Sequence, residues 1–374
     1  MGYGNACEHN VTRYDPWHAI SKRGARRAID QNSNANPPRG TGSSSAAATP
    51  RERTIPSRGA RWRDRVAGER CMIRFGGVEQ HGDIAVHRLL ALCFLAMTAL
   101  GAEAQPIDSA DRIIVSGASG NLGELTVKAL LERGVPASQL ILVSRTPEAL
   151  EDYAAMGAST RFGDFTQPES LAAAYAGGTR MLLISIGGGG LAEPRPVLHE
   201  RAIDAAVAAG VEQIAYTSWA AISQGDTGGI SSDHVATEQI LMESGVAWTI
   251  LRNSVYMDGV PEQARQMIDS GRAVVPSNDV GMSYVTRADC AAAAAAVLTT
   301  PGHENEIYDI TGPEVVTARV IAEAAASVSG KRIDIVQGDG GGFAIASLGF
   351  VSTDFETLTG RAPTSVRELL ESTL

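Results

Sequence analysis

Short apolar runs alternate with segments of helical periodicity between residues 111 and 253. The runs are nearly continuous in Ile, Leu, Val and Ala, which is typical of strands buried on both faces of a parallel sheet. Strands separated by helices predict a Rossmann-type, doubly wound α/β fold. We expect strands over 112–116, 140–144, 159–162, 180–186, 213–217 and 247–251, a helix ending at 133, and further helices over 147–156, 168–176, 196–209 and 231–244.

Residues 111–253 are therefore predicted to form an NAD(P)-binding domain, and residues 254–374 a small C-terminal α/β lobe that holds the substrate. The lobe contains an alanine-rich helical stretch with Cys290 inside it. We expect Cys290 to be a small buried apolar residue rather than a nucleophile.

The first 85 residues show no sustained apolar period and are rich in Arg, Gly, Ser, Asn and Pro. Such a segment buries too little apolar surface to offset its chain entropy, so we expect residues 1–85 to be a disordered basic extension. They hold 14 Lys and Arg against 8 Asp and Glu, a net charge of +6, and the remaining chain carries −16. The acidic balance of that remainder argues against a nucleic-acid partner or an anionic membrane surface. Binding of a polyanion by the basic extension is the alternative.

Residues 89–102 form a mostly apolar run that is too short to span a bilayer. Arg88 precedes the run, and Ala102-Glu103-Ala104 closes it with the small-x-small pattern of a cleavage site. We expect residues 86–104 to resemble a signal peptide, with a mature chain that begins near Gln105 and is periplasmic or secreted. A buried helix in a cytoplasmic protein is the alternative.

A glycine-rich loop directly follows the first expected strand and opens the first helix. The first glycine permits a tight turn, the second lets a diphosphate approach the backbone, and the third lets helix and strand pack closely. The helix N-terminus adds free N–H donors. The sequence therefore predicts a dinucleotide site over Gly117, Ala118, Ser119, Gly120, Asn121, Leu122 and Gly123.

The end of the second expected strand bears on which dinucleotide binds. NAD sites usually place an acidic residue there for the ribose diol, but this strand ends in Ser144-Arg145 with no acid before Glu148. A guanidinium suits a 2′-phosphate, so Arg145 favours NADP(H) over NAD(H). Asp164, just after the third strand, is expected to meet the adenine, with a helix-entry role as the alternative.

Several other chemistries find no support in the residues. None of the three lysines follows a tyrosine by four positions, and no Gly-x-Ser-x-Gly motif is present, which disfavours a hydrolase. His199 and His234 lie on expected helices without the spacing of metal ligands, so no metal site is expected. His234 and Glu238 are four residues apart, and we interpret them as a surface contact.

Polar residues gather where the expected strands end, at the edge where this architecture binds its ligands. For any one of them alone, structural capping is as good an interpretation as function. They are Ser185, Thr217, Ser218, Arg252, Asn253 and, three residues on, Tyr256.

The order of these motifs along the chain resembles that of a known family. The motifs are Gly117–Gly123, Arg145, 182–185, 214–218, 233–238, 251–253 with Tyr256, and 286–289. It is similar to the NmrA-like, atypical short-chain dehydrogenase/reductases, most of all the bacterial NAD(P)H:quinone oxidoreductases of type 2. The resemblance covers about residues 112–335.

The resemblance implies that the phosphates of NADPH bind at 117–122 and the 2′-phosphate near Arg145. It implies that the nicotinamide lies near Ser185, Ile186 and Asn253, with Arg287 close to the cofactor. It further implies hydride transfer to a quinone or similar small acceptor. A quinone needs little more than orientation and a hydrogen bond, so Asn253 and Tyr256 are the candidate catalytic residues.

One departure from the family pattern keeps a second function open. Gly259 and Val260 stand where the quinone reductases carry an Asn-Tyr pair, and the C-terminal part is short. The alternative is a non-enzymatic NADP(H)-binding sensor of the NmrA-like kind. A homodimer also stays open.

Overall fold

The computed structural model describes residues 110–187, 191–338 and 345–374. The basic extension over 1–85 and the signal-peptide-like segment over 86–104 lie outside the described residues.

A parallel sheet of seven strands runs in the order β3-β2-β1-β4-β5-β6-β8. The chain crosses from β1 to β2 and β3 on one side and from β4 to β8 on the other, so the strand order reverses between β1 and β4. Such a switch point leaves a crevice at the carboxyl ends of the two strands. The strands are β1 (Ile113–Ser116), β2 (Leu140–Ser144), β3 (Ser159–Phe162), β4 (Arg180–Leu183), β5 (Gln213–Trp219), β6 (Ala247–Asn253) and β8 (Glu306–Ile310).

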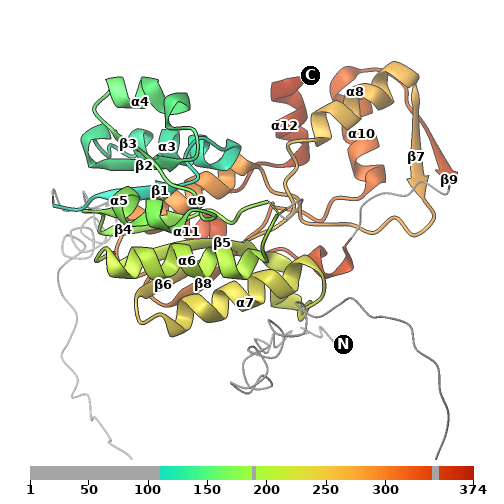
Figure 1. Cartoon of the computed structure of the whole chain (residues 1–374). Coiled ribbons are helices and arrows are strands. Elements are labelled where there is room, and N and C mark those ends of the chain that lie inside the picture. The colour runs from blue at the N-terminus through green and yellow to red at the C-terminus, as the bar shows by residue number, and fades with distance from the viewer. Residues whose placement is uncertain (1–109, 188–190, 339–344) are drawn as a thin grey trace, which may run out of the picture. The chain divides into compact units, whose positions relative to one another are not determined.

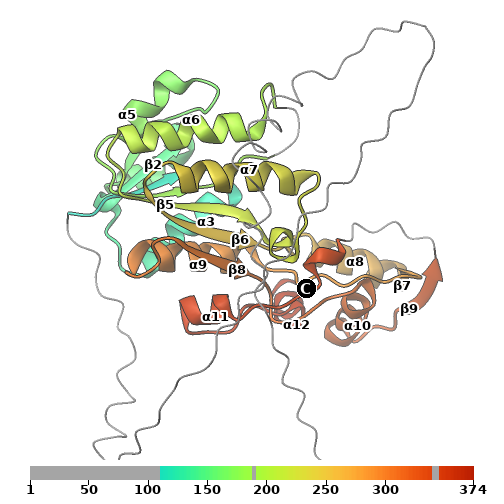
Figure 2. The same cartoon turned by 90° about the horizontal axis from the view of Figure 1, so that it is seen from below.

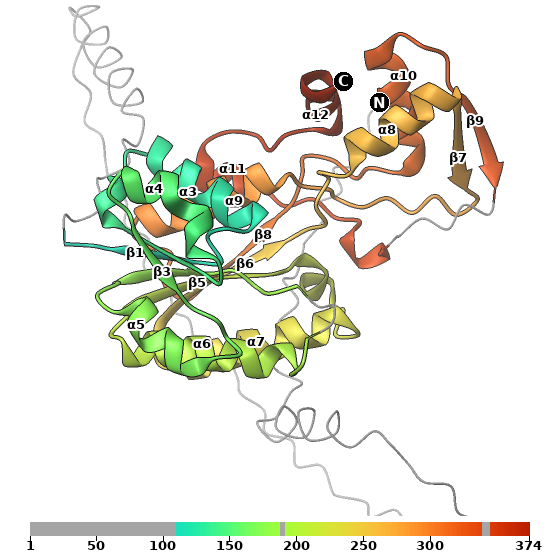
Figure 3. The same ribbon diagram turned by 45° about the horizontal axis from the view of Figure 1, so that its top comes forward.

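Helices cover both faces of this sheet (Figures 1 and 3). Successive side chains of a strand point to opposite faces, so Ile113 and Val115 of β1 pack into one core and Ile114 into the other. This is why the strands are continuously apolar. The first core lies under α3 (Asn121–Glu132), α9 (Arg287–Thr299) and α11 (Asp354–Thr359), and the second under α5 (Leu171–Tyr175), α6 (Arg195–Ala208) and α7 (Ile230–Glu243).

A C-terminal lobe packs around its own apolar core, which includes Met257, Ala264 and Ile321 (Figure 2). The lobe predicted over 254–374 is not continuous, because α9 and β8 return to the main sheet, where β8 pairs with β6. The apolar surface of α9 packs against the sheet rather than the lobe. The lobe consists of α8 (Val260–Ser270), α10 (Ala318–Ser329), α12 (Val366–Thr373) and a two-stranded parallel sheet of β7 (Arg272–Pro276) and β9 (Asp334–Gly338).

Several predicted boundaries shift for local reasons. β4 ends at Leu183 rather than at 186, whereas β5 and β6 run two residues further because Trp219 pairs with Asn253. The helices predicted over 147–156 and 168–176 each begin as a 3-10 turn at a proline. Only the short α4 (Glu151–Ala155) and α5 follow those turns.

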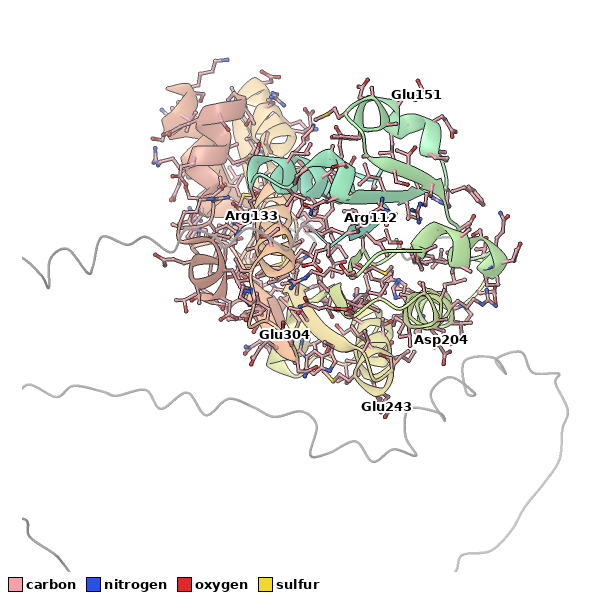
Figure 4. All side chains as sticks on the ribbon, turned by 90° about the vertical axis from the view of Figure 1, so that its left-hand side faces the viewer. Arg112, Arg133, Glu151, Asp204, Glu243 and Glu304 are labelled. Atoms are coloured by element: carbon pink, nitrogen blue, oxygen red, sulfur yellow. The ribbon has the colours of Figure 1, made fainter. Side chains whose placement is uncertain are left out.

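The acidic side chains Glu151, Asp204 and Glu243 are exposed on the outer helices α4, α6 and α7 (Figure 4). Much of the negative charge inferred from the sequence therefore faces solvent. Within the described ranges, no helix has the length and apolar character needed to cross a bilayer.

Candidate active site

A cleft of about 330 Å³ lies at the carboxyl ends of the strands, beside the switch point between β1 and β4. Its lining comes from the loop before α3, the segment after β4, the first turns of α6, α7 and α9, and the ends of β5 and β6. It includes ten of the predicted site residues, namely Gly117, Gly120, Asn121, Leu122, Gly123, Ser185, Ile186, Asn253, Tyr256 and Arg287.

The glycine loop is tied to the neighbouring strand and pressed against α3. The backbone N–H groups of Gly117 and Ala118 both donate to the carbonyl oxygen of Val143, at 2.9 and 3.0 Å. Gly117 has a φ of +90°, which a residue with a side chain adopts only with strain. A Cβ on Gly123 would overlap the Gly117 carbonyl oxygen. The loop thus brings the N-terminus of α3, with its free N–H donors, to the wall of the cleft.

The segment after β4 is held in place by a buried network. The Ser185 N–H donates to Thr217 Oγ1 at 2.8 Å, and the Ile186 N–H donates to His199 Nε2 at 3.2 Å. His199 Nδ1 lies 3.0 Å from Thr237 Oγ1. Burial lowers the pKa of His199 to about 3, so the ring stays neutral and accepts from Ile186. Ser185 and Ile186 are therefore fixed in the cleft by β5, α6 and α7.

Asn253 and Tyr256 form the wall at the end of β6. Asn253 is buried, and its amide nitrogen and oxygen make no hydrogen bond of normal geometry with any described residue. Burial raises the pKa of the Tyr256 phenol, and the neighbouring Asn253 amide lowers it by less. The Arg287 guanidinium lies over the Tyr256 ring, 4.4 Å from its centroid, and pairs with Asp258 at 3.2 Å.

The opposite wall carries a buried arginine. Arg195, the first residue of α6, is 3% exposed, and its Nη1 lies 3.3 Å from His234 Nε2. Burial, and to a smaller extent Arg195, lower the pKa of His234 to about 3, so that ring is also neutral. The Nε of Arg195 and the indole nitrogen of Trp219 are buried without a partner among the described residues.

Comparison with known proteins agrees with this geometry. A family described as NAD(P)H-binding matches residues 117–301. Quinone oxidoreductase 2 from Escherichia coli (strain K12) is 35% identical over 223 residues, which cover 59% of this chain and 76% of the relative. The chain belongs to the NmrA-like family of NAD(P)H-binding proteins.

Solved structures of this NmrA-like family have the same fold. The Citrobacter sp. triphenylmethane reductase complexed with NADP(H) matches 70% of this chain and 100% of its own, with 32% identity and a TM-score of 0.64. The E. coli NADPH-dependent quinone oxidoreductase QOR2 complexed with NADPH matches 70% and 99%, with 28% identity and a TM-score of 0.62. The family resemblance and the Rossmann-type fold inferred from the sequence are confirmed.

Four predicted site residues of this NmrA-like protein do not line the cleft. Ala118 is fully buried under the glycine loop. The Ser119 hydroxyl lies 2.5 Å from that of Ser144, which joins the loop to the end of β2. Arg145, the next residue, is exposed and forms no ion pair with a described residue. The Asp164 carboxylate accepts from the N–H and hydroxyl of Thr166, both at 2.9 Å, as expected for a turn at a helix entry.

The surface contact predicted between His234 and Glu238 is wrong, because both side chains are buried. Glu238 accepts hydrogen bonds from Arg252 Nε at 3.0 Å and Nη2 at 2.7 Å, and from the Ser218 hydroxyl at 2.5 Å. The spacing correctly puts both residues on one helix face, but that face packs on the ends of β5 and β6. Cys290 is buried, as predicted.

Arg195, Trp219 and Ile230 are among the cleft-lining residues that sequence reasoning missed. Had the strand been predicted to run to residue 219, Trp219 would have stood at its carboxyl end, among the candidate site residues. Arg195 and Ile230 carry no sequence signal beyond their place at helix starts. In the described ranges no cluster of three His, Cys, Asp or Glu side chains is arranged to hold a metal ion.

Proposed function

We propose that this protein is an NADPH-dependent reductase that reduces a quinone or a similar small electrophilic acceptor. The observation that carries the proposal is the cleft at the switch point, which joins a glycine loop to a wall of buried polar groups that have no partner among the described residues. The printed names of the relatives support it, since one is a quinone oxidoreductase and both solved relatives bind NADP(H).

The residues present fit the cofactor. The glycine loop leaves room for a diphosphate, and the first turn of α3 offers N–H donors to it. The Asn253 amide nitrogen and oxygen make no hydrogen bond of normal geometry with a described residue, so one donor and one acceptor suit a carboxamide. The exposed Arg145, beside the loop through Ser144 and Ser119, suits a 2′-phosphate.

When bound, NADPH would supply a hydride, and a quinone that takes it also takes one proton from water to become a hydroquinone. The chain contributes position and hydrogen bonds. Ser185 and Ile186 form a rigid wall, and Asn253 orients the reacting partners. Tyr256 keeps its proton because burial raises its pKa, so its hydroxyl donates a hydrogen bond to the acceptor oxygen. Arg287, over the Tyr256 ring, holds it in place.

The test uses the full chain. NADPH and NADH are titrated by fluorescence, and oxidation is then followed at the NADPH absorbance band with and without a benzoquinone. We expect NADPH to bind at least about tenfold more tightly than NADH, as one charge-assisted contact to the 2′-phosphate implies, and oxidation to depend on the quinone. NADPH binding without quinone-dependent oxidation would overturn the proposal and favour the sensor.

A further inference from the structure

The cleft contains a positive charge that no described residue neutralises. Arg195 is 3% exposed and lines the cleft. Of its five N–H donors, one meets His234 Nε2 at 3.3 Å, and the buried Nε has no partner among the residues that the structure describes. No Asp or Glu among the described residues forms an ion pair with it, although the other buried arginine, Arg252, is paired with Glu238.

An unpaired buried charge strongly destabilises a protein in general, so a buried guanidinium normally has an anionic partner. The two imidazoles near Arg195 cannot take that role. Burial keeps His234 and His199 neutral, and His234 Nδ1 already meets the Tyr216 hydroxyl at 2.8 Å. His234 therefore fixes one nitrogen of the guanidinium, Nη1, and the Nε finds no acceptor among the described residues.

Two ligands could bring the missing negative charge, the diphosphate of the cofactor or a substituent of the acceptor. The diphosphate already has the glycine loop and the first turn of α3, which follow β1. Arg195 comes from α6 and lies with His234 of α7, next to it in the fold (Figure 2). Trp219 and Ile230 line the cleft as well, and the buried indole N–H of Trp219 also lacks an acceptor within the described ranges. A ligand with an apolar ring and an anionic end matches this wall.

We propose that Arg195 binds an anionic substituent of the acceptor, so that the substrates are electrophilic ring compounds that carry a carboxylate or a comparable anion. This inference rests on the proposed reductase function. The substituent is bound and not transformed, and the hydride and the proton still reduce the quinone to a hydroquinone, whose two oxygens become hydroxyls.

The experiment compares two acceptors with the same ring, a naphthoquinone with a propanoate side chain and its methyl ester. We expect the wild-type protein to show a KM at least about tenfold lower for the carboxylate than for the ester, as one charge-assisted hydrogen bond implies. Arg195→Met should abolish this preference, and Arg195→Lys should keep part of it. Arg201→Met is the matched control, because Arg201 lies on the same helix and already pairs with Glu193 at 2.6 Å.

Each outcome separates the inference from the proposed function. Equal KM values for the two acceptors in the wild-type protein overturn the inference and leave the reductase standing. If Arg195→Met instead weakens NADPH binding tenfold, the anion belongs to the cofactor, and the inference also fails. If neither quinone is reduced, the reductase proposal fails. Naphthoate then tests the site alone, since it should raise the Tm of the wild-type protein but not of Arg195→Met, and equal effects on both would overturn it.

Discussion

Replacing Gly123 with alanine tests the close contact between α3 and the glycine loop. The new Cβ would overlap the carbonyl oxygen of Gly117 and lie 2.8 Å from the Cα of Ala118. Both neighbours are backbone atoms of residues whose N–H groups bond to Val143, so neither can turn aside. Helix α3 would have to move away from the loop.

The magnitude follows from what that movement disturbs. Overpacking of a core generally costs about 1–3 kcal/mol, and α3 also buries Leu122, Val127 and Leu130 in the core that it shares with α9. We expect the free energy of unfolding to fall by about 3 kcal/mol, at the upper end of that range. In a domain of this size the Tm would drop by about 6–12 °C. Urea unfolding followed by circular dichroism, together with thermal unfolding, measures both quantities.

Gly120→Ala is the matched control in the same loop. Gly120 has a φ of −83°, and its Cβ would lie 3.3 Å from the same Gly117 oxygen. We expect a loss of stability below about 1 kcal/mol, because no backbone strain is introduced, and weaker NADPH binding, because Gly120 lines the cleft. If Gly123→Ala unfolds with the same free energy and binds NADPH with the same affinity as the wild-type protein, the reasoning is refuted.

Three further variants test charge. Arg145→Ala should weaken NADPH binding about 10- to 100-fold in fluorescence titration, leaving NADH unchanged; equal losses would refute the 2′-phosphate role. Glu238→Gln leaves the buried Arg252 without its ion-pair partner, so the free energy of unfolding measured in urea should fall by about 3–5 kcal/mol. The double variant Glu238→Gln/Arg252→Met should regain most of that loss. Burial raises the pKa of Asp309 to about 6, above an unfolded value of about 4. As the pH rises from about 4 to 6, the free energy of unfolding of the wild-type protein should therefore fall by up to about 3 kcal/mol more than that of Asp309→Asn. If urea unfolding shows the same pH dependence for both proteins, this prediction is contradicted.

The main sheet could be predicted because its determinants are local. An apolar run such as 113–116 serves both cores of a parallel sheet, and glycine at 117 and 123 marks the turn and the close packing before any contact is known. The return of α9 and β8 to the sheet could not be predicted. It depends on pairing between β6 and β8, which are separated in sequence by α8 and β7 of the lobe and by α9.

By itself, the sequence determined the parallel α/β fold, the glycine loop and the order of the strands along the chain, because turn geometry and strand periodicity are properties of neighbouring residues, whereas the ends of β4 and β6 shifted by two or three residues. Tertiary structure alone decided that α7 turns His234 and Glu238 inwards. It also decided that Arg195 meets a histidine 39 residues away and forms no ion pair with an acid in the described part of the chain. Helical spacing specifies a face, but only long-range packing specifies what that face contacts.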